Sequence, residues 1–572
     1  MIPSTIIILY TVGMLQNWMR FFVLLTLFFA CLELFAKVDP QIEWVTFEYE
    51  DSKWIFNKDE TDLARQYLRE YVRARKVLKP LFSESPDSTT FLILNNTDFA
   101  NGSATIWPYP LITLNPALPA PRSSLGEFAD PMFELVLHEY THILNLYPAH
   151  GIIKIPRWIF GSVISPNMLL PRWYTEGLAV YIESYFGDGH GRLHSQYISG
   201  LSRAFTLKNQ WSHYSIDQLN EFPPDWLGGN RAYLLGGVLL AELFEKSGND
   251  KIEVLNQAHS RRVPYFLNGA AENATEKSYV DWLEESYKSL RSKTEKQIQQ
   301  LRKVQPAKSY PLRQPRAENV SPSISPNGKY LAYASASYRE GGAVALIKKG
   351  RKGFYRQKTA RLVEGKGIQK ISWHPTHLSF YYDAVSSFER FQLFSDIYRY
   401  DLKTKKKQQL TKGLRAHHPT VHPDGQWIYF FQNYPKGQRL ARIDLDGKNF
   451  AVLLEPEPWT HLIDMTFLDG QKLLISQQKK GMTRNAQLYT IKDHSLVQSS
   501  VFLSQWSGNI SFVKMTSKGL LFSSDLSGVE NLYLWESPLN ANGKAQPRPV
   551  THSLTRVVDG DLDPDKSTLL FT

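Results

Sequence analysis

Apolar and polar residues follow two different periods along this chain. Residues 62–78 (DLARQYLREYVRARKVL) place apolar side chains every three to four positions, which predicts an amphipathic helix. Short apolar runs at residues 90–94 and 111–114 predict strands, and Asn101-Gly102 between them is typical of a turn. A second long helical pattern covers residues 280–303. Residues 37–306 are therefore expected to form one α+β domain.

A repeat of short strands and turns follows a predicted linker at residues 307–319. Each copy has two strands around a turn such as Ser325-Pro326-Asn327-Gly328. The copies lie at residues 323–335, 372–384, 420–432, 465–477, 513–525 and 560–572. Their spacing of 45–49 residues suits one four-stranded propeller blade each.

This repeat resembles those of TolB-like and WD-type β-propellers, and the resemblance implies an all-β propeller over residues 320–572 with six blade-type repeats. The chain stops inside the sixth copy. Either the sequence is a fragment of a longer propeller protein, or its amino-terminal strands complete the last blade. The expected architecture is therefore multidomain, with an α+β domain followed by a propeller.

An apolar run stands near the amino terminus. Residues 21–32 (FFVLLTLFFACL) follow Arg20, a pattern typical of a secretory signal. Residues 1–36 are predicted to be a signal peptide or a membrane anchor, and the residues ending at Cys31 loosely resemble a lipoprotein cleavage site. Export to the periplasm or cell envelope is expected, whereas the mode of anchoring stays open.

Composition describes a globular, basic protein. The hydrophobic fraction is 42%, the charged fraction is 21%, and the net charge is +11. The basic clusters are predicted to be solvated turns, with contact to anionic lipids or envelope polymers as the alternative. No nucleic-acid-binding motif is present. Cys31 is the only cysteine, so the chain forms no internal disulfide.

The stretch FELVLHEYTHILNL at residues 133–146 carries the candidate chemistry. His138 and His142 are four residues apart, so a helix places both imidazoles on one face. Two histidines in this arrangement suit zinc, whose bonds to nitrogen are about 2.0–2.1 Å long. Glu139 lies beside them, where it can take a proton from a water whose pKa the zinc lowers to about 7. The alternative is a surface helix with two solvated histidines.

A third ligand is implied by a resemblance. Residues 172–183 (RWYTEGLAVYIE) resemble the second zinc-binding helix of the gluzincins, especially the aminopeptidase N family. In that family the glutamate matching Glu176 completes the zinc site, although Thr175 here replaces the usual asparagine. Small residues such as Gly177 are expected to let this helix pack closely on the HEYTH helix. Glu183, seven residues after Glu176, is a candidate to orient a ligand histidine.

A further match stands at residues 231–237 (RAYLLGG). The same family has a tyrosine at the start of a later helix, and this tyrosine hydrogen-bonds the oxyanion of the tetrahedral intermediate. Tyr233 with Gly236 fits that position, while a tyrosine that merely packs at a helix start is the alternative.

Two features depart from the aminopeptidases. The 33 residues between His142 and Glu176 exceed the family spacing, and residues 149–171 are expected to form a lid or hairpin over the cleft that touches lipid. In addition, residues 101–115 contain no acid to hold a substrate ammonium group. An endopeptidase is therefore favoured over an aminopeptidase.

The resemblance implies that residues 37–306 form a gluzincin-like metallopeptidase domain of the α+β zincin type. The sequence thus favours an exported zinc metallopeptidase that cleaves a peptide or protein substrate. Its propeller would gate substrate or bind a protein partner. Membrane-surface contact is expected through the amino terminus or residues 149–171. The alternative is a non-enzymatic envelope scaffold that uses the propeller for protein interaction. A serine peptidase is unsupported, because the chain contains no G-x-S-x-G motif.

Overall fold

The computed structural model describes residues 42–572 except 188, 190, 212, 223–226, 263–265, 306–308, 313–317, 338, 390–391, 493–494, 537–545 and 565–567. Trp44–Phe388 and Gln392–Thr572 form one compact unit, and a second unit, Met1–Glu43 with Glu389–Phe391, falls almost wholly outside the described residues. The predicted signal peptide or anchor at residues 1–36 also falls outside them. Among the described helices, none is both long enough and apolar enough to span a bilayer.

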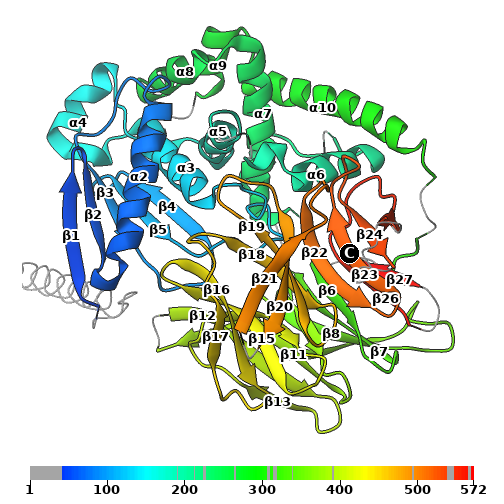
Figure 1. The fold of residues 1–572 in the computed structure, drawn as a ribbon. Coiled ribbons are helices and arrows are strands. Elements are labelled where there is room, and N and C mark those ends of the chain that lie inside the picture. The colour runs from blue at the N-terminus through cyan, green and yellow to red at the C-terminus, as the bar shows by residue number, and fades with distance from the viewer. Residues whose placement is uncertain are drawn as a thin grey trace, which may run out of the picture. The chain divides into compact units, whose positions relative to one another are not determined.

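A five-stranded mixed sheet opens the described chain (Figure 1). Its strands are β1 (Trp44–Tyr49), β2 (Ser52–Asn57), β3 (Thr89–Ile93), β4 (Asn101–Thr105) and β5 (Leu111–Asn115), in the order β1-β2-β3-β5-β4. β2, β3 and β5 run parallel, and β1 and β4 pair antiparallel at the two edges. The two predicted strands are confirmed within one residue at each end. The predicted turn at Asn101-Gly102 is wrong, because these residues pair with β5 and begin the edge strand β4.

Helix α2 (Thr61–Leu78) connects β2 to β3, which confirms the helix predicted at residues 62–78. Aromatic rings fill the space between this helix, the sheet and α3 (Pro131–Leu146). Trp54 of β2 stacks on Phe91 of β3 with ring centroids 4.2 Å apart. Tyr71 of α2 meets Tyr140 of α3 edge to face at 5.0 Å. All four rings are buried, so α3 is fixed against the sheet by its apolar face.

Further helices follow α3 in sequence and lie together above the sheet and propeller in Figure 1. They are α4 (Lys154–Phe160), α5 (Arg172–Tyr185), α6 (Gln196–Leu207), α7 (Arg231–Ser247), α8 (Lys251–Ser260), α9 (Asn268–Thr275) and α10 (Tyr279–Leu301). The short 3-10 helices are η1 (Lys58–Glu60), η2 (Gly151–Ile153), η3 (Gly161–Val163), η4 (Pro166–Leu169), η5 (Arg192–His194), η6 (Asp217–Asn220) and η7 (Gly228–Asn230). α10 confirms the helix predicted at residues 280–303, and a capping box of Ser278 and Asp281 fixes its start.

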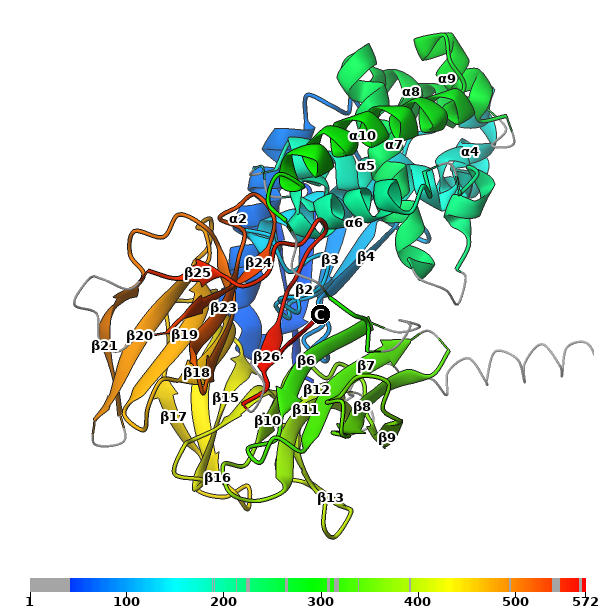
Figure 2. The same cartoon turned by 90° about the vertical axis from the view of Figure 1, so that its right-hand side faces the viewer.

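Beyond α10 the chain forms a β-propeller, whose sheets are arranged around a common axis in Figure 2. Each blade uses four consecutive antiparallel strands. The first two blades are β6 (Glu318–Ile324), β7 (Tyr330–Ser337), β8 (Gly341–Lys348), β9 (Thr359–Glu364), then β10 (Ile371–Trp373), β11 (Ser379–Phe388), β12 (Gln392–Asp401), β13 (Lys406–Gln409). The third and fourth are β14 (Ala416–Val421), β15 (Trp427–Tyr434), β16 (Gly437–Asp444), β17 (Ala451–Leu454), then β18 (His461–Phe467), β19 (Lys472–Gln478), β20 (Asn485–Lys492), β21 (Ser495–Phe502). The fifth is β22 (Ile510–Thr516), β23 (Gly519–Ser524), β24 (Asn531–Trp535), β25 (Arg548–Pro549).

The expectation of six blades is wrong, because the described residues form five. The sixth repeat forms a two-stranded sheet of β26 (Gly560–Leu562) and β27 (Leu569–Phe571). The amino-terminal strands do not complete it, since β6–β9 are already paired in a blade of their own. Instead, side chains fasten this hairpin to the first blade. The backbone N–H groups of Ser321 and Ile324 donate to the carboxylates of Asp559 and Asp561 at 2.7 and 2.8 Å.

The repeated turns join the first and second strands of their blades. His374 in the second blade places Nε2 3.2 Å from the carbonyl oxygen of Gly425 in the third. His422 in the third blade places Nε2 3.0 Å from the carbonyl oxygen of Gly470 in the fourth. Because neighbouring turns contact one another, these turns lie on one face of the propeller, as their common sequence position predicts.

Candidate metal centre and cleft

Helix α3 carries the two histidines and begins where the sequence indicates. Asp130 accepts a hydrogen bond from the backbone N–H of Phe133 at 3.3 Å, and Pro131 occupies the first helical position. His138 and His142 are both buried, at 5% and 9% exposure, so the alternative of two solvated surface histidines is wrong. They stand one helical turn apart with their rings edge to face, 4.8 Å between centroids.

The structure brings the three predicted metal ligands together. Nε2 of His138 and Nε2 of His142 are 3.2 Å apart. Oε2 of Glu176, on α5, is 3.4 Å from the first and 3.2 Å from the second. A tetrahedral ion with bonds of about 2.0–2.1 Å holds neighbouring ligand atoms about 3.3–3.4 Å apart. The three atoms therefore form the triangle that a zinc ion requires on one side of its coordination shell.

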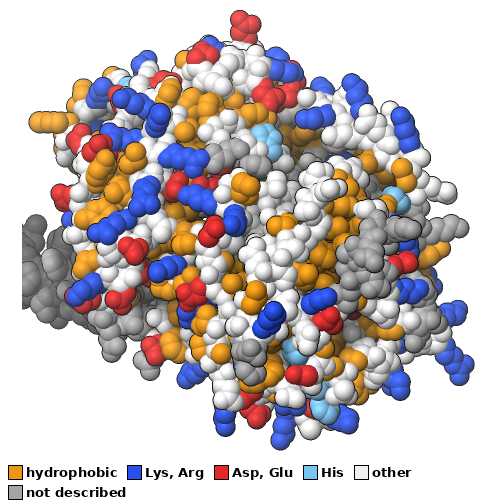
Figure 3. All heavy atoms as spheres, in the orientation of Figure 1, with side chains coloured by type: hydrophobic (Ala, Val, Ile, Leu, Met, Phe, Trp, Pro, Cys, Tyr) orange, Lys and Arg blue, Asp and Glu red, His pale blue; other side chains and the backbone are white. Residues whose placement is uncertain are grey.

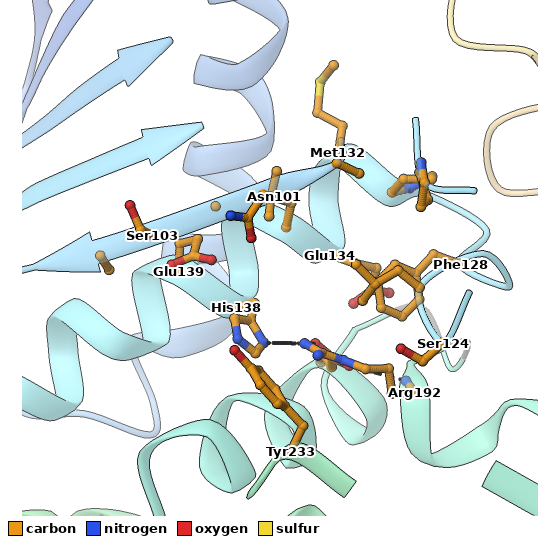
Figure 4. A pocket seen from close by; sticks show the side chains of 18 of the residues that line it. Asn101, Ser103, Ser124, Phe128, Met132, Glu134, His138, Glu139, Arg192 and Tyr233 are labelled. Atoms are coloured by element: carbon orange, nitrogen blue, oxygen red, sulfur yellow. Dashed lines mark hydrogen bonds and ion pairs between the residues drawn. The ribbon is translucent and has the colours of Figure 1, made fainter. Parts of the chain in front are cut away.

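Glu183 and Arg192 lie behind His138. Oε2 of Glu183 is 2.9 Å from Nδ1 of His138. Arg192 binds the same carboxylate through Nε at 2.6 Å and Nη2 at 2.7 Å, and its Nη2 is also 2.8 Å from Nδ1 of His138 (Figure 4). When Nε2 is a metal ligand, Nδ1 carries the ring proton and donates it to Glu183. The carboxylate thus fixes both the tautomer and the ring orientation.

Burial and charge shift the pKa values of these groups. Burial raises the pKa of the Glu176 carboxyl, but His142 and His138 outweigh it and hold this pKa well below its ordinary value. Burial also raises the pKa of Glu183, and Arg192 outweighs it and lowers it to about 2. Burial and Arg192 lower the pKa of His138, whereas hydrogen bonds to Glu176 and Glu183 raise it to about 9. A nitrogen that binds zinc carries no proton, so zinc must displace a proton from His138 when it binds.

Glu139 lines the same cavity without joining the ligand triangle. Its carboxylate lies close to the backbone of β4 at Gly102. A Cβ on this glycine would lie 2.5 Å from Oε1 of Glu139. Figure 4 shows this carboxylate beside Ser103 and Asn101 of the strand. Burial raises the pKa of Glu139, and this effect brings a carboxylate closer to the range of a general base. Glycine at position 102 is thus what allows strand and carboxylate to approach.

Tyr233 lies in the first turn of α7 and faces the metal ligands. Its ring lies beside that of His138 in Figure 4, with centroids 6.2 Å apart and an angle of 21° between the ring planes. Arg172 donates from Nη2 to the Tyr233 hydroxyl at 3.3 Å, and its Nε is 3.6 Å from Oε1 of Glu176. Burial and the charge of Glu176 raise the pKa of Tyr233 to about 12, so its hydroxyl keeps its proton at neutral pH.

Glycines bring α5 and α7 into close contact. A Cβ on Gly177 of α5 would lie 2.5 Å from the carbonyl carbon of Gly236 on α7. A Cβ on Gly236 would lie 2.1 Å from the carbonyl oxygen of Trp173. The expectation that Gly177 packs on the HEYTH helix is wrong, because Gly177 packs on α7. Because α5 and α7 are in close contact, Glu176 of α5 and Tyr233 of α7 line the same cavity.

The cavity has a volume of about 560 Å³ and is lined by all five predicted site residues. Apolar side chains of Leu125, Phe128 and Met132 form part of its wall, and Trp459 from the propeller reaches it. The expected lid at residues 149–171 is wrong, because no described residue of that segment lines the cavity. The segment instead folds as η2, α4, η3 and η4. Residues 151–163 contain no buried side chain, whereas His150 and Asn167 near its two ends are buried.

Sequence reasoning missed Arg172, Arg192 and Gly102. Arg192 belongs to the short η5 segment after α5, and nothing in its local sequence distinguishes it from a solvated arginine. Arg172 stands four residues before Glu176, a spacing that places two helical side chains on one face and is the available signal. Gly102 is explained only by the approach of Glu139, a residue 37 positions later in the chain.

Neither a protein-family model nor a curated protein matches the chain. Among solved structures, TolB from Acinetobacter baumannii is 17% identical with a TM-score of 0.32, and the match covers 42% of this chain and 55% of that one. The chain thus spans about half the length of that structure. The β-propeller domain of the Trilobed protease from Pyrococcus furiosus is 12% identical, with coverage of 43% and 87% and a TM-score of 0.29. The tricorn protease is 17% identical, with coverage of 44% and 26% and a TM-score of 0.32. At such TM-scores these likenesses say nothing about activity, and the propeller assignment rests on the chain's own sheets.

Proposed function

We propose that this chain is a zinc-dependent peptidase that hydrolyses peptide bonds in a peptide or protein substrate. The carrying observation is the triangle of Nε2 of His138, Nε2 of His142 and Oε2 of Glu176, whose sides are 3.2, 3.2 and 3.4 Å. Two imidazoles and one carboxylate are a donor set that catalytic zinc uses, and three protein ligands leave a fourth position open.

His138, His142 and Glu176 would hold the ion, and Glu183 would keep His138 oriented toward it. Zinc, when bound, supplies Lewis-acid chemistry that lowers the pKa of water to about 7 and polarises a carbonyl group. Leu125, Phe128 and Met132 place apolar side chains in the wall beside this charged site, and a less polar surrounding strengthens the electrostatic interactions within it.

Two side chains are assigned to proton transfer and charge stabilisation. Glu139 accepts the proton of the attacking water and passes it to the leaving amine, since its carboxylate lines the cavity without contacting the ligand triangle. Tyr233 donates its hydroxyl hydrogen to the carbonyl oxygen as negative charge develops on it. Its pKa of about 12 keeps that hydrogen available at neutral pH.

Strand β4 favours an extended peptide as the substrate. It stands at the edge of the five-stranded sheet and lines the cavity through Asn101, Gly102, Ser103 and Ala104. An edge strand offers backbone N–H and C=O groups to an incoming chain. Because residues 101–115 carry no acid for a substrate ammonium group, we assign cleavage within a chain rather than at its amino terminus.

The place of action proposed is outside the cytoplasm, in the periplasm or cell envelope. This part of the proposal is supported by Arg20 and the apolar run at residues 21–32, which precede the described residues. The propeller is assigned to gating substrate or docking a protein partner. Fractionation of cells that express the full chain tests the location, and recovery in the cytoplasm with residues 19–36 retained would contradict it.

The activity is tested by elemental analysis and cleavage of an unstructured peptide library, for the wild type and for Glu139→Gln. The wild type is expected to carry zinc and to cleave the library. Glu139→Gln should keep its zinc, because Glu139 is not a ligand, and should lose about 10²–10⁴-fold in turnover. A zinc-loaded wild type that cleaves no peptide and no unfolded protein would instead favour the envelope scaffold.

A further inference from the structure

Helix α4 is largely exposed although most of its side chains are apolar. None of its residues is buried. The exposed fractions of Trp158, Ile155 and Phe160 are 86%, 66% and 64%. Large apolar side chains exposed together in this way are normally covered by protein or lipid, since exposed apolar surface is costly in water. In Figure 3 hydrophobic side chains project from the surface where α4 lies in Figure 1.

The turn between β4 and β5 extends this apolar surface. Ser162, just after α4, donates a hydrogen bond to the carbonyl oxygen of Pro108 in that turn at 2.9 Å. Trp107 and Tyr109 flank Pro108 and are 54% and 50% exposed. Tryptophan and tyrosine are the side chains that favour the headgroup region of a bilayer, where one end is apolar and the other wet.

The charges within the exposed segment are positive, and the acid Glu84 lies at its base against His150. Residues 140–175 contain Lys154, Arg157 and Arg172 and no acidic residue, and residues 99–126 contain no acidic residue either. Arg261 approaches the start of the segment, since a Cβ on Gly151 would lie 3.8 Å from its Cγ. Lysine and arginine next to exposed apolar side chains match a surface of anionic lipid headgroups, which attracts each such charge.

Hydrogen bonds and an ion pair hold the two ends of the segment, near His150 and Asn167, so α4 between them has a fixed position. Asn167 donates from Nδ2 to the carbonyl oxygen of Asn145 at 2.8 Å and to Oδ1 of Asn256 at 3.1 Å. His150 binds Ser260 through its backbone N–H at 3.0 Å and Glu84 through Nε2 at 2.9 Å. Arg157 lies over the ring of Tyr147 at 4.7 Å. These contacts anchor both ends and leave the apolar side chains of α4 pointing outward.

We propose that residues 151–163, together with Trp107 and Tyr109, bind the surface of an anionic lipid bilayer by inserting their apolar side chains at headgroup depth. This surface (the α4 patch) consists of residues 151–163 with Trp107 and Tyr109. Its combination of aromatic, aliphatic and basic side chains is that of an interfacial membrane contact. The inference goes beyond the proposed peptidase function and does not depend on it.

A dye at position 158 of the full chain tests this contact locally, whatever the amino terminus does. Cys31→Ser removes the native thiol, and Trp158→Cys accepts an environment-sensitive nitrobenzoxadiazole label. Vesicles of phosphatidylcholine with about 30% phosphatidylglycerol should raise the emission and shift it to shorter wavelength, and spin-labelled lipid should quench it. The matched control is Val497→Cys on the propeller, 47% exposed, whose label should not respond.

A second experiment reverses the charge of one lysine in the α4 patch. Lys154→Glu in the labelled chain should weaken the response to anionic vesicles about tenfold, whereas Lys403→Glu on the propeller should not change it. The proposal is overturned if the label at position 158 responds no more than the label at 497, or equally with and without phosphatidylglycerol. A response that follows protein concentration without vesicles would also overturn it, and would make the α4 patch a protein interface.

Discussion

Oε2 of Glu183 lies 2.9 Å from Nδ1 of His138, on the side of the ring opposite the other candidate ligands. Glu183 is fully buried and its second partner is Arg192. An imidazole that binds a metal through Nε2 is oriented by the acceptor of its Nδ1 hydrogen. The position of Nε2 of His138 is thus tied to Glu183, a residue that is not itself a candidate ligand.

The first prediction follows from this relationship. Glu183→Gln keeps the size of the side chain but removes the charge that His138 and Arg192 share. Zinc affinity should fall about 10–100-fold, as for other groups that orient a ligand histidine. Competition with a fluorescent zinc chelator measures it. Glu245→Gln, on the surface of α7, is the matched control and should bind zinc as the wild type does.

Removal of the metal should lower stability as well as activity. An ion that binds the folded chain and not the unfolded chain stabilises it by about 2.7 kcal/mol at a hundredfold excess over its dissociation constant. Chelation should therefore lower the melting temperature of the wild type, and added zinc should restore it. His142→Ala should contain no zinc, and its melting temperature should not respond to chelator. Equal zinc content in the wild type and in His142→Ala would contradict the ligand assignment.

Tyr233→Phe separates a catalytic tyrosine from one that only packs. The ring remains to stack on His138, but the hydroxyl that would stabilise negative charge on the carbonyl oxygen is lost. Turnover should fall about 10²–10³-fold with KM nearly unchanged, because this interaction grows in the transition state. Steady-state kinetics with a quenched fluorescent peptide measures both constants. Wild-type turnover in Tyr233→Phe would leave the tyrosine a packing role only.

The candidate ligands could be predicted from the sequence in two ways, by local spacing for the histidines and by resemblance for the glutamate. His138 and His142 share one helix face at a separation of four, and Glu176 stands in a recognisable segment. Arg192 and Gly102 could not be read in this way, since each is explained by a contact with a residue distant in sequence. Strand existence was predictable where apolar runs were dense, whereas β4 (NGSAT) lacks such a run and was taken for a turn.

The number of complete blades is another feature that the sequence predicts only in part. Six turns recur at regular spacing, so the sequence indicates where first and second strands meet. A similar third strand follows the pair at residues 396–402, 486–493 and 530–537, so the sequence also indicates the third strand of those blades. The last repeat forms only the β26–β27 hairpin, held by Asp559 and Asp561 against the first blade. Periodicity therefore predicts the propeller but not the number of its complete blades.

A buried histidine in the propeller gives a prediction on acid stability. Burial and nearby Arg484 lower the pKa of His461 to about 3, whereas an unfolded histidine titrates near 6.5. The unfolded chain therefore takes up the proton first, so this group's contribution is full above about pH 6.5 and declines toward pH 3. The urea unfolding free energy of His461→Gln should fall less steeply than that of the wild type between pH 7 and pH 4. Identical slopes would contradict it.

The last prediction concerns the contact between α5 and α7. In Gly236→Ala the new Cβ would lie 2.1 Å from the carbonyl oxygen of Trp173, a backbone atom that moves only with its helix. The helices must separate, which should cost about 1–3 kcal/mol in urea unfolding and displace Glu176 from the histidines, so zinc affinity should also fall. Gly470→Ala is the matched control, since a Cβ there meets nothing within 4 Å. Its unfolding free energy should equal or slightly exceed that of the wild type. If both alanine variants behave alike, close packing at Gly236 does not position the site.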